Sequence, residues 1–414
     1  MHSHFTETIS ESIWDSAIVL TPQDAVSFLN HKENFRSFSQ GLTQLICKYG
    51  YEKDPEDIEE KTNFVSKSLS SFPNPPVKST IKDWFSDKRR PGPNRTSRTH
   101  LFHLCFALSI SMEDVQWFFG HVYFDRCFNC HTKDEAVYYY CLSRKLPYSH
   151  AQNLLAAVNS LPEPPQTQTI NRFTSDIRTR LDNCANDDEL LAFFTDNLSV
   201  FSQWNTTALK YIREYLSRIQ GKPSDKAVLE AYKAGKPLFA QDVENCSLII
   251  REYLATSNQG MRHSISQKNI TSIDFMLDQI LTVNTGLSRK APIPEIVRRS
   301  FPSKKTFSAI LNKAKTLTSY DALRKCLVLL QFYAFWVMLV LKPEMYSTHL
   351  NEWFDIYCDE ANALLAECGY EELFAGNPYD WLFLWSATTN EPLKTLREVI
   401  DCLYSMKDES AFPD

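Results

Sequence analysis

Apolar residues recur at intervals of three and four along most of this chain. Leu42, Leu45, Ile46 and Tyr49 give the first clear example, and this spacing places all four side chains on one face of an α-helix. Similar stripes continue through the middle and C-terminal parts of the sequence without a fixed repeat length. The pattern predicts an all-α, multi-helix fold that includes a helical bundle.

Several polar and proline residues mark where these helices begin. Thr21 followed by Pro22 has the composition of a helix N-cap and first turn. Near the C-terminus, Asn377 is suited to cap a helix that begins at Pro378, and Asp380 would lie near its positive end. The dense aromatic run that follows, residues 379–385, predicts a buried core helix, with partner binding or self-association as the alternative.

The clearest break between helical patterns is the proline-rich stretch LPEPPQTQT at residues 161–169. A weaker polar break lies near residues 258–268. At 414 residues the chain is long enough for two or three domains. We therefore expect an N-terminal domain over residues 1–160, a middle domain over 166–260 and a C-terminal domain over 266–414.

Composition and motifs disfavour the common enzyme classes. The chain contains only 10 glycines, and neither GxGxxG nor GxxxxGK[ST] occurs, which argues against dinucleotide-binding and P-loop folds. The GxSxG, HExxH and DxDxDG motifs are also absent. The sequence therefore predicts a non-catalytic protein without a cofactor.

The cellular context is indicated by the N-terminus and the cysteines. Residues 1–18 lack a positive start and an apolar stretch, so no secretory signal is expected, and 11 cysteines in such a chain favour reduced thiols. The apolar stretch 326–341 is too short to span a bilayer, which takes about 20 residues of helix. We expect a cytoplasmic protein without a membrane segment, and a buried helix over 326–341.

Positive charge is concentrated in two places, although the net charge of the chain is −6. Residues 77–98 carry seven basic and two acidic side chains, and residues 289–315 carry eight basic and one acidic. In the first of these basic islands, a short helix with Ile81, Trp84 and Phe85 on one side precedes the loop DKRRPGPNRTS and two further helices. Such runs are usually solvated faces, but this one lies beside a compact helical pattern.

The segment from Pro76 to Phe119 resembles the lambda-repressor-like (Cro-type) helix-turn-helix family of DNA-binding proteins. The resemblance rests on the stretch STIKDW, the following KRRP loop and the phrase ALSISMEDV. The resemblance implies DNA contacts from the start of a recognition helix and phosphate contacts from the loop after it. The residues implied in the first island are Lys78, Ser79, Thr80, Lys82, Lys88, Arg89, Arg90 and Arg95. One departure is the long proline-rich turn over residues 70–77, where the family has a tight turn.

The second island matches the first when the two segments are aligned without a gap. The matching residues in the first segment are Pro76, Lys78, Thr80, Arg98, Leu101, Leu104 and Phe106, and in the second Pro302, Lys304, Thr306, Arg324, Leu327, Leu330 and Phe332. This match, which we call the island alignment, suggests a degenerate second helix-turn-helix unit over residues 302–334, in which Lys304, Lys305 and Ser308 would contact DNA. Chance similarity between two amphipathic helix pairs is the alternative.

A metal site is a competing interpretation of one short motif. Cys127 and Cys130 in CFNCH have C-x₂-C spacing, which suits zinc when two histidines complete the site. His100, His103, Cys105 and His121 are nearby in the sequence. Buried structural cysteines are the interpretation we favour, and no metal is assigned.

The sequence thus favours a sequence-specific binder of double-stranded DNA that acts as a transcriptional regulator. Lysine and arginine would neutralise phosphates, and short polar side chains would read base edges. The alternative is an all-helical protein-protein interaction scaffold whose helix-turn-helix units do not touch DNA. Its partner, or a second copy of the chain, would bind the C-terminal aromatic region.

Overall fold

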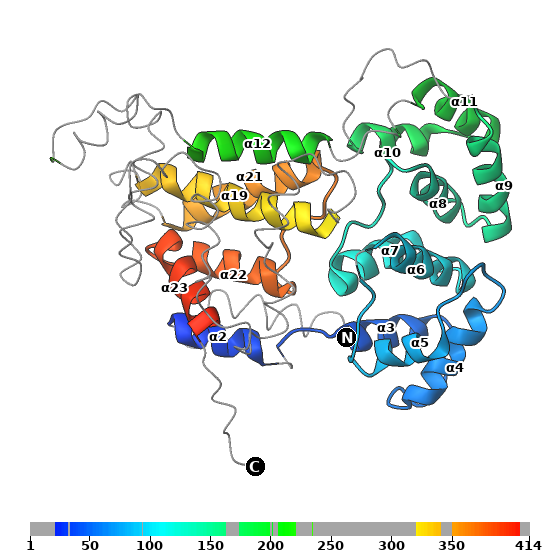
Figure 1. Cartoon of the computed structure of the whole chain (residues 1–414), viewed down its shortest axis with the longest axis horizontal. Helices are drawn as coiled ribbons and strands as arrows, with labels where there is room; N and C mark the ends of the chain where they lie inside the picture. Colours follow the sequence, from blue (N-terminus) through cyan, green and yellow to red (C-terminus); the bar gives the residue numbers. More distant parts are fainter. Residues whose placement is uncertain are drawn as a thin grey trace.

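The computed structural model describes residues 21–31, 34–92, 94–162, 174–198, 206–220, 320–340 and 350–405, together with residues 201 and 234. Every regular element within these ranges is a helix, as the apolar spacing predicts. The helices form two lobes that lie side by side (Figure 1), and each lobe has its own hydrophobic core.

The first lobe contains the elements from α3 to α11. They are α3 (Phe38–Lys48), α4 (Ile58–Leu69), α5 (Lys78–Phe85), α6 (Arg95–Ala107), α7 (Met112–Phe118), the π-helical turn η1 (Phe119–Tyr123), α8 (Lys133–Ser143), α9 (Tyr148–Asn159), α10 (Thr174–Asn183) and α11 (Asp187–Asn197). Leu101, Phe102 and Leu104 of α6 lie at the centre of its core and are almost fully buried.

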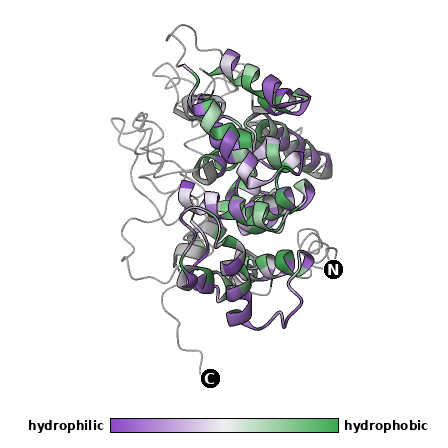
Figure 2. Cartoon of the chain, turned by 90° about the vertical axis from the view of Figure 1, so that its right-hand side faces the viewer, coloured by the Kyte–Doolittle hydropathy of each residue, from purple (hydrophilic) through white to green (hydrophobic). Residues whose placement is uncertain are grey.

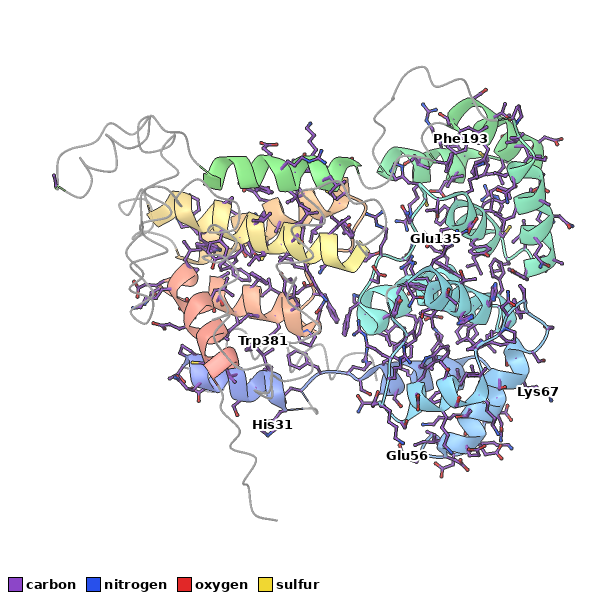
Figure 3. The ribbon with its side chains drawn as sticks, in the orientation of Figure 1. His31, Glu56, Lys67, Glu135, Phe193 and Trp381 are labelled. Carbon is purple, nitrogen blue, oxygen red and sulfur yellow. The ribbon has the colours of Figure 1, made fainter. Side chains whose placement is uncertain are left out.

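The second lobe brings together helices from the N-terminal and C-terminal parts of the described chain. It contains α2 (Pro22–Asn30), α12 (Thr206–Gln220), α19 (Tyr320–Val340), α21 (Leu350–Glu367), α22 (Pro378–Ala387) and α23 (Pro392–Ser405). The ring of Phe28 in α2 stacks on Trp381 in α22 at 4.7 Å, and α2 also packs on α23 (Figures 1 and 3). Helix α2 is therefore part of the core that the C-terminal helices form.

The two cores divide the chain differently from the three segments expected from the sequence. Ile177, Leu181 and Phe194 belong to the first core, whereas Ala208 and Ile212 of α12 belong to the second. The described part of the middle segment is thus shared between the lobes. An amphipathic pattern shows that a helix has an apolar face, but not which core that face covers.

The predicted helix starts are confirmed at both ends of the chain. Thr21 accepts a hydrogen bond from the backbone N–H of Asp24 in a capping box, and Asn377 accepts one from the N–H of Tyr379 at 3.0 Å. The aromatic side chains that follow Asn377 are buried in the second core, so they are not exposed to a partner. They are Tyr379, Trp381, Phe383 and Trp385.

Helix α19 contains the apolar stretch that the sequence predicts to be a core helix. Its side chains from Leu323 to Tyr333, and Trp336, are buried against the rest of the second lobe. Among the described residues, no helix is long and apolar enough to cross a membrane. Figure 2 shows the same partition, with hydrophilic residues on the outer surfaces of the helices and hydrophobic residues between them.

Gly41 provides a test of the packing in the first lobe, because it lies in α3 against Val122 of η1. A Cβ atom placed on Gly41 would lie 2.3 Å from a methyl carbon of Val122, so alanine does not fit there. We expect Gly41→Ala to lower the free energy of unfolding by roughly 1–3 kcal/mol, as overpacking does. Denaturant unfolding would measure this change.

The double variant Gly41→Ala/Val122→Ala is the matched test, because it removes the clashing methyl groups. It should be less destabilised than the sum of the two single variants. Strict additivity would contradict the close contact between α3 and η1.

Candidate nucleic-acid interface

The predicted recognition helix α5 has one packed side and one exposed side. Ile81, Trp84 and Phe85 are buried against α3 and α4, as their spacing predicts. The opposite side carries the predicted DNA-contacting residues: Lys78, Ser79 and Lys82 are exposed, and Thr80 is half-buried. Burial of one face of this short helix therefore directs the polar face outward.

The long proline-rich turn before α5 is packed against the lobe. The ring centre of Phe72 lies 5.1 Å from that of His103 in α6 and 4.8 Å from that of Tyr148 in α9. The Nε2 of His100 is 2.9 Å from the carbonyl oxygen of Asn74, which implies a hydrogen bond from the protonated nitrogen. These contacts fix the entry to α5, although the turn lacks the short form typical of the resembled family.

The basic loop after α5 is anchored at both ends. At its start, the hydroxyl of Ser39 donates a hydrogen bond to the carbonyl of Phe85 at 2.7 Å, and the backbone N–H of Ser39 donates to Asp87 at 3.1 Å. At its end, the hydroxyl of Tyr123 donates to the carbonyl of Gly92 at 2.6 Å. Lys88 and Arg89 are exposed between these anchors.

The positive charge of this face is smaller than the sequence count indicates. Glu59 in α4 forms ion pairs with Lys78 at 2.6 Å and with Lys82 at 3.1 Å, and Arg95 pairs with Asp134. Surface pairs of this kind contribute about 0–1 kcal/mol each and can rearrange. Arg90 is half-buried, and its Nη2 lies 3.5 Å from the carbonyl oxygen of Tyr123.

Arg98 belongs to the first basic island by sequence, but it is a core residue. It is only 2% exposed and pairs with Asp125 at 2.9 Å and with Glu135 at 2.7 Å. The sequence does contain a signal for this burial, because Arg98 precedes Leu101 by three positions and Phe102 by four, on the buried stripe of α6. Counting charge without regard to helix face misses that signal.

Lys88 and Arg89 are exposed and, like the half-buried Arg90, have no acidic partner in the part of the chain that the structure describes. The residues predicted in the second island, Lys304, Lys305 and Ser308, lie outside the described residues. The predicted DNA-contacting residues that the structure describes are therefore those of the first lobe.

The cysteines and histidines of the zinc hypothesis have other surroundings. Cys127 and Cys130 are buried, and burial raises the pKa of the Cys130 thiol to about 12 and also raises that of Cys127. His103 lies against Phe72 and Tyr148. Among the described residues, no group of three or more His, Cys, Asp or Glu side chains is arranged to hold a metal ion.

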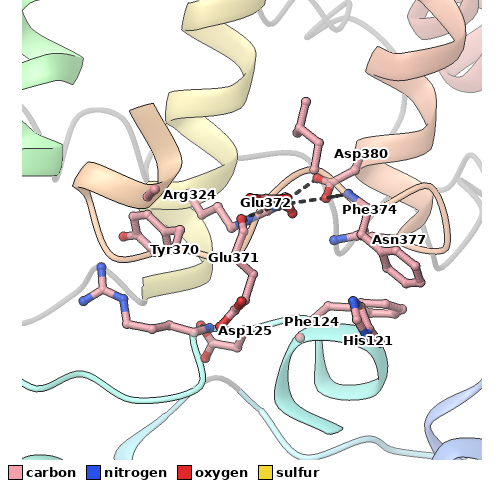
Figure 4. Close-up of a pocket in the computed structure, with 14 residues that line it drawn as sticks. His121, Phe124, Asp125, Arg324, Tyr370, Glu371, Glu372, Phe374, Asn377 and Asp380 are labelled. Carbon is pink, nitrogen blue, oxygen red and sulfur yellow. Dashed lines mark hydrogen bonds and ion pairs between the residues drawn. The ribbon is translucent and has the colours of Figure 1, made fainter. Parts of the chain in front are cut away.

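A cavity of about 470 Å³ lies between the two lobes (Figure 4). Its walls include His121 and Asp125 from the first lobe and Tyr370 and Phe374 from the second. Two of the carboxylates that line it form ion pairs within the protein, since Asp125 pairs with Arg98 and Asp380 pairs with Arg324 at 2.7 Å. These interactions stabilise the walls of the cavity.

Comparisons with protein-family models, with curated proteins and with solved structures find no match for this chain.

The burial of His103 against the proline-rich turn predicts that the free energy of unfolding depends on pH. Burial, with a smaller contribution from nearby His100, lowers the pKa of His103 to about 4. A histidine in an unfolded chain titrates near about 6.5, so between these values the unfolded state binds more protons than the folded state. The free energy of unfolding should fall as the pH drops from about 6.5 towards about 4, by up to roughly 3 kcal/mol.

Denaturant unfolding of the wild type and of His103→Gln at a series of pH values would measure this effect. The variant should lose that part of the pH dependence, whereas His100→Gln should retain most of it. An unchanged pH dependence in His103→Gln would contradict the burial of a neutral imidazole under the turn.

Proposed function

We propose that this protein binds double-stranded DNA through one face of the first lobe and acts as a non-catalytic transcriptional regulator. The observation that carries this proposal is the exposed polar side of α5, held outward by the burial of Ile81, Trp84 and Phe85. The order α3 to α7, in which α4 and α5 pack on each other, also agrees with the resemblance to lambda-repressor-like domains. The resemblance and the geometry thus support the same face.

The first turn of α5 has side chains suited to base edges. Ser79 and Lys82 can hydrogen-bond to bases in a major groove, and Lys78 can reach either a base or a phosphate. Val77, just before α5, is 65% exposed, which is unusual for an apolar side chain among the described residues. An exposed apolar group at this position can contact the methyl group of thymine.

Phosphate binding would come from the loop and from the helix end. Lys88 and Arg89 are exposed beside α5, and Arg95 lies at the start of α6. Val77 supplies no side-chain cap to the N-terminus of α5, and its carbonyl accepts from the N–H groups of Thr80 and Ile81, so the backbone N–H groups of Lys78 and Ser79 could donate to a phosphate. On this proposal Lys304, Lys305 and Ser308 would form a second contact region.

The scaffold alternative receives less support. It requires the C-terminal aromatic run as a contact surface, and those side chains lie in the second core. The only large hydrophobic residues strongly exposed in the described part of the chain are Val77 and Ile356, which lie in different lobes. These two isolated positions do not form a contiguous apolar patch of the kind a stable scaffold contact needs.

Lys88→Ala/Arg89→Ala tests the phosphate contacts. Binding to duplex DNA selected from a random pool should weaken in this double variant, and the slope of log affinity against log salt should decrease by about 2. Fluorescence anisotropy between about 50 and 200 mM salt, a range in which phosphate contacts change the affinity strongly, would measure both.

The matched control is Lys210→Ala/Arg213→Ala. It removes the same charge from exposed positions on α12 in the second lobe. This control should bind DNA nearly as well as the wild type. Equal losses in the two double variants would indicate a general charge effect and contradict the assigned face.

The variant Glu59→Gln is expected to change the affinity for duplex DNA in the opposite direction. The two lysines lower the pKa of the Glu59 carboxyl, so it is ionised at neutral pH and holds Lys78 and Lys82. Neutralising it frees both lysines for phosphates and removes a negative charge from the face. Affinity for duplex DNA should therefore rise and the salt slope should steepen, as titrations at several salt concentrations would show. Weaker binding by Glu59→Gln would contradict a DNA-contacting role for α5.

A further inference from the structure

Each lobe contains a buried arginine at the start of its central helix. In the first lobe this residue is Arg98 of α6, and in the second it is Arg324 of α19, which is 7% exposed. These two residues lie opposite one another in the island alignment of the sequence. Their hydrogen-bond partners provide a comparison that is independent of sequence identity.

Arg98 is bound by one loop and by the helix that follows it. Its guanidinium donates to the carbonyl oxygens of Arg126 at 2.9 Å and Cys127 at 3.3 Å, and to the carboxylate of Glu135 in α8 at 2.7 and 3.0 Å. The backbone N–H of Asn129 donates to the same carboxylate at 2.7 Å. Arginine, loop and helix α8 are thereby joined in one network.

Arg324 makes a similar set of bonds in the second lobe (Figure 4). It donates to the carbonyl oxygens of Glu371 at 3.2 Å and Glu372 at 3.0 Å, and to both carboxylate oxygens of Asp380 in α22 at 2.7 and 2.8 Å. The backbone N–H of Phe374 donates to Asp380 at 3.1 Å. We refer to the two networks as the Arg98 clamp and the Arg324 clamp.

The partners in the two clamps occur in the same order and at the same spacing along the chain. Apart from Asp125, which pairs with Arg98 at 2.9 Å and lies opposite Tyr370, the four acceptor and donor positions of the first clamp lie opposite those of the second in one gap-free alignment, which we call the clamp alignment. The pairs are Arg126 with Glu371, Cys127 with Glu372, Asn129 with Phe374, and Glu135 with Asp380. Because most of these bonds involve backbone atoms, the agreement does not depend on side-chain identity.

Backbone conformation, ring contacts and helix packing around the clamps also correspond in the same two alignments. Phe124 and Gly369, opposite one another in the clamp alignment, both adopt left-handed backbone conformations, with φ of 55° and 70°. Two ring pairs also correspond, with Phe106 opposite Phe332 and Tyr138 opposite Phe383. The ring centres of Phe106 and Tyr138 in α8 are 5.6 Å apart, and those of Phe332 and Phe383 in α22 are 5.2 Å apart. The following helices, α9 and α23, pack on α8 and α22 in turn.

The island alignment and the clamp alignment pair residues at different offsets along the chain, and this difference in offset has a local cause. The interval from the arginine to the left-handed residue runs from Arg98 to Phe124 in the first lobe and from Arg324 to Gly369 in the second. The second interval is longer, and in it α21 stands in the place of α7 and η1. An insertion confined to one connection leaves the rest of a unit in register. The two alignments are therefore compatible with a single duplication.

From these correspondences we infer that the chain is a tandem of two copies of one helical unit, and that each unit engages its own half-site of duplex DNA. This inference rests on the proposed function for its DNA-binding part. Two linked units can bind two half-sites with one chain, and the second binding event is then intramolecular.

The test uses the full chain and a selected duplex whose two half-sites have been mapped by footprinting. The wild type should bind as one chain per duplex, and scrambling either half-site should reduce its affinity by on the order of 10²–10⁴. Lys88→Ala/Arg89→Ala should still protect one half-site. Its affinity should then be sensitive to scrambling of that half-site alone.

The outcomes separate this inference from the proposed function. A wild type that binds DNA but protects a single half-site would overturn the two-unit inference and leave the proposed function intact. Two chains per duplex would have the same meaning. So would complete loss of binding in Lys88→Ala/Arg89→Ala at about 50 mM salt. A wild type that retains no duplex at about 50 mM salt would overturn both. The Lys210→Ala/Arg213→Ala control should match the wild type in every arm.

Discussion

The buried arginine clamps are the interaction on which the rest of the structure depends. Removing a guanidinium from water is costly, and the cost is offset only when its hydrogen bonds and its charge are satisfied. Arg98 meets this requirement with two carboxylates and two backbone carbonyls. Because these partners come from a loop and from α8, the central helix can occupy only one position relative to both. Loss of one partner from such a pair typically costs about 3–5 kcal/mol.

The Arg98 clamp also connects the core of the first lobe to its exposed basic face. Arg98 lies in the first turns of α6, directly after the loop that carries Lys88 and Arg89. That loop ends at a hydrogen bond from Tyr123, which closely precedes the clamp partner Asp125 in the chain. The surface cations are therefore attached to a rigid support, so less conformational freedom would be lost in the proposed binding to DNA.

How much of this could be predicted from the sequence depends on whether a feature is local. Helices, caps and the buried side of α5 follow from residue spacing, and the sequence predicts them correctly. The assignment of α12 to the second core and the pairing of Arg98 with Glu135 depend on contacts between distant segments, which spacing does not determine. The island alignment is visible in the sequence, whereas the clamp alignment joins backbone positions whose side chains differ, as Arg126 and Glu371 do.

The two lobes meet through the same loops that form the clamps. Arg126 donates to the carbonyl of Cys368 at 2.6 Å, and its guanidinium lies 4.3 Å from the ring centre of Tyr370, so a residue whose own carbonyl accepts from Arg98 also binds the opposite lobe. The polar contacts of Arg126 with the second lobe therefore come from a loop that also forms a clamp. A displacement of either clamp loop would alter the contact between lobes, because packed interiors transmit strain. The relative position of the lobes is therefore coupled to the internal order of each.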